Sequence, residues 1–348
     1  MIYIQHDNEQ YEKALAFLHS CRTISLDTET TGLDPLQDMV LLIQVGNKYQ
    51  QYVFDVARLG KAIQKLKPIL ESTTTIKLLH NAKYDYEMLK GHLNITLENI
   101  QCVMINEQLL VNGRKVSSSL ETLAKKYTRA ELNKSVRETF KNTKFGDEFT
   151  QEQLTYAAED VIYLEEIRAA QFKLLTKHNL MKVWRIETDV IPAMGDLELA
   201  GAYVDRDLWT QAENETKLEQ SLVYNELNIL FAKIIPVDMF GVPAINYNSP
   251  KQLLPILKKV LGTSGRKLES TGVDVLQDYA GNEYIDAILK YRKIEKRLST
   301  YGSEFLQHIH PVTGRVHSNF FQLGGLYDEN KSDKKDGTGT GRLSSKNP

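Results

Sequence analysis

The heptapeptide Thr23-Ile24-Ser25-Leu26-Asp27-Thr28-Glu29 predicts a β-strand that ends in two acids. Apolar and polar residues alternate along it, and successive side chains of a strand point to opposite faces of its sheet. Ile24 and Leu26 therefore share one face, and the carboxylates of Asp27 and Glu29 share the other. Two carboxylates two residues apart can hold one cation. An acidic strand end can also simply lead into the next element, so this motif alone does not define a metal site.

Outward from this strand, the N-terminal half alternates between predicted strands and helices. Short apolar runs of strand length cover residues 39–45, 52–54 and 76–79. Turn residues separate them, around Gly32 to Pro35 and at Gly46-Asn47. The last run leads into a predicted helix over residues 83–90. A sheet with helices packed on it is the simplest arrangement, so we expect the α/β class.

A second helix is predicted after Thr150, because Thr150-Gln151-Glu152-Gln153 matches a capping box. Residues with helical spacing follow it and should face the core: Leu154, Ala157, Val161, Leu164 and Ile167. Tyr156 and Asp160 are four residues apart, so they lie one turn from each other on a neighbouring stripe. A phenol and a carboxylate so placed can address the same water molecule.

The four acids indicate a metal site only when they are taken together. Alone, Asp85 could be a first-turn acid that stabilises a helix dipole, and Tyr156 and Asp160 could be a core aromatic and a solvated acid. If Asp27, Glu29, Asp85 and Asp160 converge, their charges repel unless cations neutralise them. Oxygen ligands without nitrogen or sulfur suit Mg²⁺ or Mn²⁺. Two such ions bridged by acids are a common device for cutting phosphodiesters.

The composition is that of an ordinary globular protein. The 348 residues suggest two or three domains, and the net charge of −2 gives no global basic character for nucleic-acid binding. Cys21 and Cys102 form neither a disulfide framework nor a zinc site, as expected of reduced thiols. No apolar run of membrane-spanning length and no secretory signal is visible. We therefore expect a cytoplasmic protein without a membrane partner.

From about Trp184 the sequence predicts mainly helices, over residues 206–233, 250–261 and 284–309. Residues 251–300 contain ten Lys or Arg and six Asp or Glu, so this window carries +4 while the whole chain carries −2. Local positive charge of this kind suits phosphates, although a solvated helix face is an equal alternative for each residue. The candidate DNA contacts are Lys251, Arg292, Lys293, Lys296 and Arg297.

Together the three motifs resemble the proofreading 3′–5′ exonucleases whose signature is four acids and a tyrosine. The matching segments are Leu26 to Thr30, Asn81 to Asp85, and Tyr156-Ala157-Ala158-Glu159-Asp160. The resemblance implies a ribonuclease H-like fold, a mixed sheet flanked by helices, for an exonuclease domain over residues 1–183.

The rest of the chain resembles family A DNA polymerases, such as bacterial or phage DNA polymerase I. The segments that carry this resemblance are Ile186 to Asp205, Asn248 to Leu253, Tyr291 to Tyr301, Thr313 to His317, and Thr340 to Ser345. It implies palm entry and a helical thumb over residues 184–305, and the start of the palm over residues 306–348. The palm acids and fingers helix of the family are not among these residues, so we expect no DNA synthesis by this chain alone.

The resemblance also implies residue roles. Asp27, Glu29 and Asp160 would hold one Mg²⁺ or Mn²⁺, and Asp27 with Asp85 would hold a second. Tyr156 and Glu29 would orient the nucleophile, and deoxynucleoside monophosphates would be released singly. By the same resemblance, the single-stranded 3′ end would be contacted by Leu33, Asn81 and Thr28. Primer–template DNA would be contacted by Arg342.

Two alternatives remain open. An RNA-trimming exonuclease like ribonuclease D shares the three motifs, but the thumb-like segment 248–301 argues against it. Alternatively, the chain is a DNA-holding scaffold that docks a separately encoded palm-and-fingers chain, with hydrolysis secondary or lost.

Overall fold

The chain folds into two compact units. The computed structural model describes residues 1–111, 114, 116–132, 136–140, 142–324 and 341–347. One unit combines Met1–Ala202 with Pro311–Pro348, and the other is Tyr203–His310. This division by compactness falls at other residues than the predicted domain boundaries at 183 and 305, which stay a prediction.

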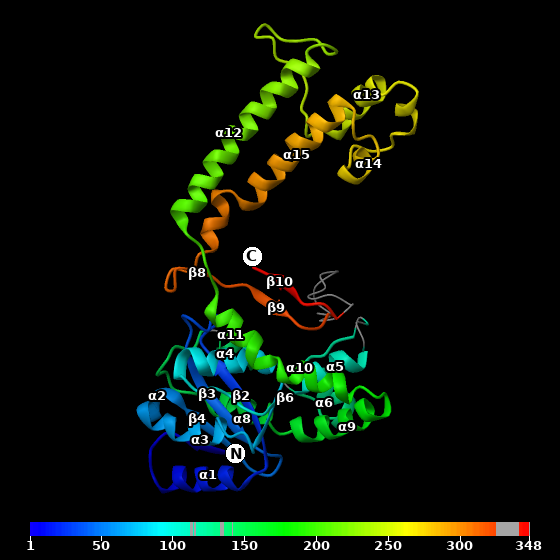
Figure 1. Ribbon diagram of the computed structural model, residues 1–348. Helices are drawn as coiled ribbons and strands as arrows, with labels where there is room; N and C mark the ends of the chain where they lie inside the picture. The colour runs from blue at the N-terminus through cyan, green and yellow to red at the C-terminus, as the bar shows by residue number, and fades with distance from the viewer. Residues whose placement is uncertain (112–113, 115, 133–135, 141, 325–340, 348) are drawn as a thin grey trace. The chain divides into compact units, whose positions relative to one another are not determined.

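The first unit is built on a six-stranded sheet in the order β1-β4-β3-β2-β5-β6 (Figure 1). Antiparallel pairing joins β3 to both β2 and β4, and the other neighbours are parallel. The α/β class and the four predicted strands are confirmed. The strands are β1 (Ile2–Ile4), β2 (Thr23–Thr30), β3 (Val40–Gly46), β4 (Gln51–Asp55), β5 (Ile76–Leu79) and β6 (Ile100–Cys102).

Helices cover both faces of this sheet, so its central strands are buried on both sides. Ile24 and Leu26 of β2 belong to the core formed with α1 and α4. Leu42 of β3 and Val53 of β4 belong to the core under α8. Asp27 and Glu29 alternate with Leu26 and so point toward α8, as the period of β2 predicts.

The helical segments of the first unit are α1 (Glu9–Ser20), α2 (Val56–Leu59), η1 (Gly60–Leu66), α3 (Lys67–Leu70), α4 (Ala82–Leu93), α5 (Val103–Val111), α6 (Leu120–Thr128), α7 (Arg137–Phe140), α8 (Gln151–Glu159), α9 (Leu164–Lys177), α10 (Met181–Asp189) and α11 (Ile191–Ala200). Three short strands follow later in the chain, β8 (Arg315–Val316), β9 (Asn319–Phe321) and β10 (Ser344–Lys346), while β7 (Ala202–Tyr203) lies where the two units divide.

The helix after Thr150 is shorter than its apolar pattern predicts. Its capping box is present, because Thr150 accepts from the Gln153 backbone and the Gln153 side chain accepts from Thr150. The helix ends at Glu159, where Ile162 N–H donates to the Glu159 carbonyl and closes a turn before α9. Val161, Leu164 and Ile167 are nonetheless buried as predicted. The apolar pattern therefore identified the core residues but not the end of the helix. The turn after Glu159 keeps the apolar residues at nearly helical spacing.

The second unit is a helical hairpin of α12 (Arg206–Phe231) and α15 (Glu283–Tyr301), with α13 (Pro250–Val260), η2 (Ser264–Lys267) and α14 (Val273–Gln277) near the tip (Figure 1). Its core joins Val223, Leu227 and Phe231 to Ile285 and Ile288. The predicted helix over 284–309 ends early, because Gly302 adopts extended backbone and a separate turn, η3 (Ser303–His308), follows. In the described part of the chain, no helix is long and apolar enough to cross a membrane.

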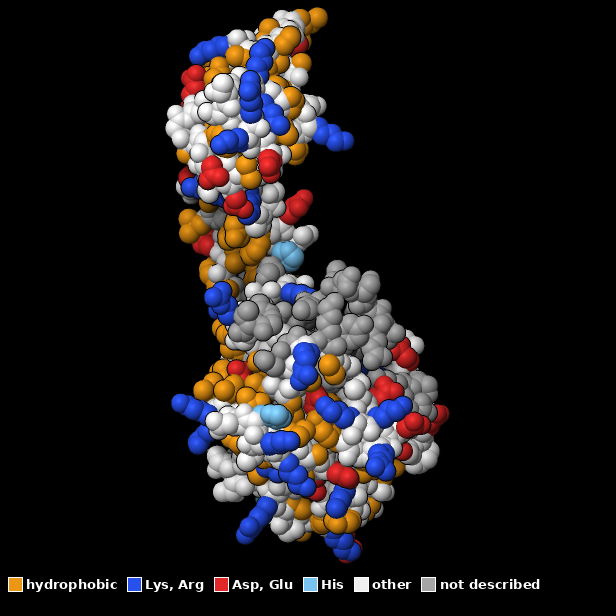
Figure 2. Space-filling view, turned by 90° about the vertical axis from the view of Figure 1, so that its right-hand side faces the viewer, with side chains coloured by type: hydrophobic (Ala, Val, Ile, Leu, Met, Phe, Trp, Pro, Cys, Tyr) orange, Lys and Arg blue, Asp and Glu red, His pale blue; other side chains and the backbone are white. Residues whose placement is uncertain are grey.

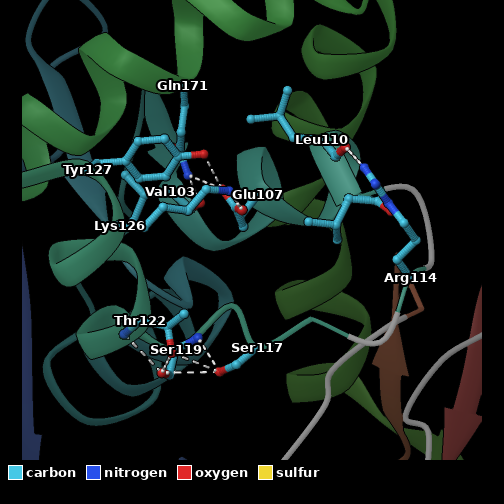
Figure 3. A network of polar contacts seen from close by, with 11 residues as sticks. Val103, Glu107, Leu110, Arg114, Ser117, Ser119, Thr122, Lys126, Tyr127 and Gln171 are labelled. Atoms are coloured by element: carbon cyan, nitrogen blue, oxygen red, sulfur yellow. Dashed lines mark hydrogen bonds and ion pairs between the residues drawn. The ribbon is translucent and has the colours of Figure 1, made fainter.

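A buried network of hydrogen bonds and one ion pair connects α5, α6 and α9 (Figure 3). Glu107 of α5 is fully buried, and its carboxylate accepts from Lys126 Nζ at 2.6 Å and from the Tyr127 hydroxyl at 2.7 Å. Gln171 Nε2 donates to the same carboxylate at 3.1 Å. Asn106 extends the network, since its amide contacts both Gln171 and the Trp184 indole. Removing one member of such a network is costly, because its buried partners lose their hydrogen bonds.

We expect Glu107→Ala to destabilise the first unit by about 2–4 kcal/mol, because the Tyr127 hydroxyl and the Gln171 amide lose their acceptor, and an unsatisfied buried donor costs about 1–3 kcal/mol. Unfolding in urea, followed by Trp184 fluorescence in a Trp209→Phe background, measures this. The matched control is Glu131→Ala, since the Lys125–Glu131 pair is exposed on both sides and should contribute less than about 1 kcal/mol. Equal losses in the two variants would contradict a structural role for the network.

Candidate active site

Three carboxylates meet at the end of β2. Oxygen atoms of Asp27, Glu29 and Asp160 all lie within 4.8 Å of one another. The first two come from β2, and Asp160 is the C-cap residue that follows the last residue of α8. An all-oxygen set of acids at this spacing has the chemistry of a Mg²⁺ or Mn²⁺ site, so the residues fit a divalent cation.

Asp85 approaches the three acids from the other side of β2. It lies in the first turn of α4, which begins directly after β5, and it is buried. Thr28 Oγ1 donates to Asp85 Oδ1 at 2.7 Å. The Thr28 side chain is buried and its hydroxyl is engaged with Asp85, and the predicted contact of Thr28 to substrate stays a prediction. The hydrogen bond fixes the direction of this carboxylate.

Tyr156 is held beside the acids by α7 and α8. Its ring centroid lies 6.1 Å from that of Phe140, which is buried against Leu154 and Ala157. Burial and the nearby carboxylates, Asp160 first, raise the pKa of the Tyr156 phenol. The phenol therefore stays protonated at neutral pH, so it can donate a hydrogen bond.

The electrostatics of the cluster favour a cation. Burial and then the Asp160 carboxylate raise the pKa of Glu29 to about 8, and burial raises the pKa of Asp85 to about 7. Burial, followed by Asp85 and Asp160, raises the pKa of Asp27 well above its ordinary range. Arg137 of α7 acts in the opposite direction on Asp27 and Glu29. No motif in the sequence marks Arg137, so only the fold reveals this neighbour.

The predicted substrate residues Leu33 and Asn81 line one cavity of about 370 Å³. Leu33 is 80% exposed. Its loop is held by Asp38, whose carboxylate accepts from Asp34 N at 2.8 Å, and by Tyr84, whose hydroxyl donates to the Gly32 carbonyl at 2.8 Å.

The opposite wall of this cavity was not predicted. Asn319 to Leu323 line it, although they lie far along the chain. Glu198 holds this segment in place, because it accepts from Phe320 N at 2.6 Å and forms an ion pair with Lys83. Contacts between such distant segments leave no periodic signal in a sequence.

The predicted DNA-binding residues fall into two groups. The side chains of Lys251, Lys293, Lys296, Arg297 and Arg342 are exposed. Arg297 is paired with Glu219. Arg292 is half-buried, and its guanidinium donates to the carbonyls of Thr271 and Tyr247, so it joins α15 to neighbouring loops. Figure 2 shows Lys and Arg side chains over the visible face, with Asp and Glu among them.

Comparison with known proteins agrees with this fold. A 3′–5′ exonuclease family model matches residues 2–175, and a DNA polymerase family A model matches residues 216–348. The fold and the acids thus define a 3′–5′ exonuclease domain. The chain belongs to the family A DNA polymerases that carry this domain.

Two relatives show the extent of the match. DNA polymerase I of Borreliella burgdorferi is 28% identical over 344 residues, which are 95% of this chain and 35% of that protein. DNA polymerase DpoZ of Salmonella phage PMBT28 is 28% identical over 359 residues, which are 95% of this chain and 55% of that protein. The chain thus spans 35% of the first relative and 55% of the second.

A solved structure shows a similar fold. The POL domain of Pol1 from M. smegmatis, in complex with DNA primer-template and dNTP, has a TM-score of 0.70 at 18% identity. The match covers 100% of this chain and 55% of that one.

We expect Mn²⁺ to raise the melting temperature, and more at pH 8 than at pH 6. Without metal, folding raises the Glu29 pKa from 4.5 to about 8. The folded state therefore favours the neutral form of Glu29. The contribution of this group to the free energy of unfolding is fully present below pH 4.5 and is lost as the pH rises through 8. A cation binds the ionised carboxylates, so it competes with protons for them. It therefore stabilises the folded protein most at the higher pH, where the carboxylates have lost their protons.

Differential scanning fluorimetry in matched buffers measures this shift. The control is the double variant Asp27→Asn/Glu29→Gln, which should show no Mn²⁺ shift at either pH. A shift of the same size at both pH values, or one that persists in the double variant, would contradict a cation site at these acids.

Proposed function

We propose that this chain is a 3′–5′ exonuclease that removes deoxynucleoside monophosphates singly from DNA, with two Mg²⁺ or Mn²⁺ ions as cofactors. The observation that carries the proposal is the cluster of Asp27, Glu29 and Asp160, with Asp85 behind it and Tyr156 beside it. Asp27, Glu29 and Asp160 would hold one ion, and Asp27 with Asp85 the other. Bound divalent ions supply a hydroxide-like nucleophile near neutral pH and stabilise the leaving 3′-oxygen.

The protein groups position the reaction. Tyr156 keeps its proton, so its hydroxyl donates to the attacking water or to the phosphate and does not act as a base. Thr28 holds Asp85, and the anchored loop at Asp38 presents Leu33. Fixing these groups before substrate arrives removes reorganisation from the reaction barrier.

The substrate is a single-stranded DNA 3′ end. The cavity lined by Leu33 and Asn81 is flanked by apolar side chains such as Met104 and Phe321, which suit a nucleobase that has left its stack. A mispaired end unstacks at lower cost, so selectivity for mismatches follows from the entry of a single strand. The exposed cations of the second unit, Lys251, Lys293 and Lys296, would contact duplex phosphates.

Two alternatives have less support. The family A polymerase match over residues 216–348 favours DNA over the RNA substrates of a ribonuclease D-like enzyme. A scaffold that docks a separate polymerase chain needs no gathered acids, yet the acids are present and converge. Because the relatives are bacterial and phage polymerases, we propose that the protein acts in the cytoplasm of a bacterial or phage-infected cell.

The decisive experiment compares the intact chain with Asp27→Ala/Glu29→Ala on 5′-labelled single-stranded and mismatched-end DNA with Mg²⁺. We expect stepwise shortening from the 3′ end and a loss of at least about 1,000-fold in the double variant, as when a principal catalytic group is removed. The control is Glu9→Ala/Glu131→Ala, which removes two exposed acids far from the cluster. Faster cleavage of an RNA oligonucleotide of the same sequence would favour the ribonuclease, and DNA binding without hydrolysis would favour the scaffold.

Tyr156→Phe tests the positioning role of the phenol. The ring that packs on Phe140 is kept, and only the hydroxyl is lost. We expect kcat to fall by about 10- to 100-fold, typical of a group that orients its neighbours, while KM for DNA changes little. If the hydroxyl were a general base, it would act only when deprotonated, so the rise of the rate with pH that reports its pKa would disappear in this variant. An unchanged profile together with lower kcat therefore supports positioning.

A further inference from the structure

Gln44 of β3 is a buried amide whose polar atoms have no partner. Its side chain is fully buried, and neither Oε1 nor Nε2 makes a hydrogen bond to the part of the protein that the structure describes. A buried amide without hydrogen bonds costs on the order of 1–3 kcal/mol. Such a group is rarely kept unless it has a task in another state of the site.

The register of the sheet places this amide beside Asp27. Gln44 is paired directly with Asp27 across the antiparallel β2–β3 ladder. Directly paired residues point to the same face, with their Cβ atoms about 4.5–5.5 Å apart. The amide therefore lies within reach of the carboxylate that is central to the proposed cation sites.

The other neighbours of Gln44 on this face are both apolar and polar. Val53 is its partner on β4, and Leu42 lies two residues before it on β3; both belong to the core under α8. Three further neighbours are polar: Ser25 and Glu29, which flank Asp27 on its own side of β2, and Asp55, which pairs with Leu42 on β4. The buried Oγ of Ser25 also makes no hydrogen bond to any described residue, whereas Asp55 already accepts from the Tyr3 hydroxyl at 2.6 Å and from Arg58 N at 2.9 Å. Asp27 is the acceptor that is paired directly with Gln44, since Glu29 and Asp55 lie diagonally from it.

We propose that Gln44 is a positioning residue of the active site, whose Nε2 donates a hydrogen bond to the Asp27 carboxylate when that acid holds a cation. The inference rests on the proposed two-cation function. Residues behind a metal ligand commonly set its direction and basicity, and their loss costs about 10- to 100-fold in metal affinity. The amide is neutral, so it orients Asp27 without adding to the crowded negative charge.

The test is Gln44→Met, which keeps the volume and removes the amide. If Gln44 only fills space, this variant should be at least as stable in EDTA and unchanged in metal affinity. We expect stability in EDTA equal to or above the wild type, but Mn²⁺ affinity measured by calorimetry lower by about 10- to 100-fold and a matching rise in the Mn²⁺ concentration needed for half-maximal cleavage. The control is Leu42→Met, a repacking on the same face, which should change neither.

Unchanged Mn²⁺ affinity in folded Gln44→Met would overturn the inference and leave the exonuclease intact. Gln44→Leu replaces it if the Met variant fails to fold, judged by circular dichroism. A wild-type chain that neither binds Mn²⁺ nor shortens DNA would sink the proposed function itself and the inference with it.

Discussion

Crowding of negative charge at the end of β2 is the constraint on which the rest of the site depends. Three carboxylates share a space less than 4.8 Å across, and a fourth lies behind them. Without a cation each ionised acid raises the pKa of the next. In the metal-free protein, protons bound to the carboxylates reduce the repulsion between them. In the metal-loaded protein, divalent ions would replace these protons and neutralise the charge.

Such a cluster needs a rigid frame, because repulsion would otherwise push the acids apart. β2 is an interior strand, whose pairing with β5 anchors Thr23 to Ser25 and whose pairing with β3 continues through Asp27 and Glu29. The capping box sets where α8 begins, and its buried face presses against the sheet, which fixes Tyr156 and Asp160. Stabilisation comes from the apolar cores on the two faces and offsets the unfavourable electrostatics between them.

The substrate side depends on segments that are distant in the sequence. Glu198 binds both Lys83 of α4 and the backbone of Phe320, so part of the segment that resembles the start of a polymerase palm completes the cavity lined by Leu33 and Asn81. Gln322 adds a hydrogen bond to the Glu187 carbonyl at 2.9 Å. For this reason residues 311–324 belong to the first compact unit.

The sequence by itself determined the α/β class, the strand carrying Asp27 and Glu29, the capped helix carrying Tyr156, and the identity of the acids, because these follow from local periodicity, capping and short motifs. Only the tertiary structure decided that Asp27, Glu29 and Asp160 converge and that Thr28 donates a hydrogen bond to Asp85. It also placed Gln44 and Arg137 beside the acids. It also decided that Arg292 is held by carbonyl groups. Strand register, helix docking and side-chain burial join residues far apart in the chain, and such pairings leave no trace in the spacing of one sequence.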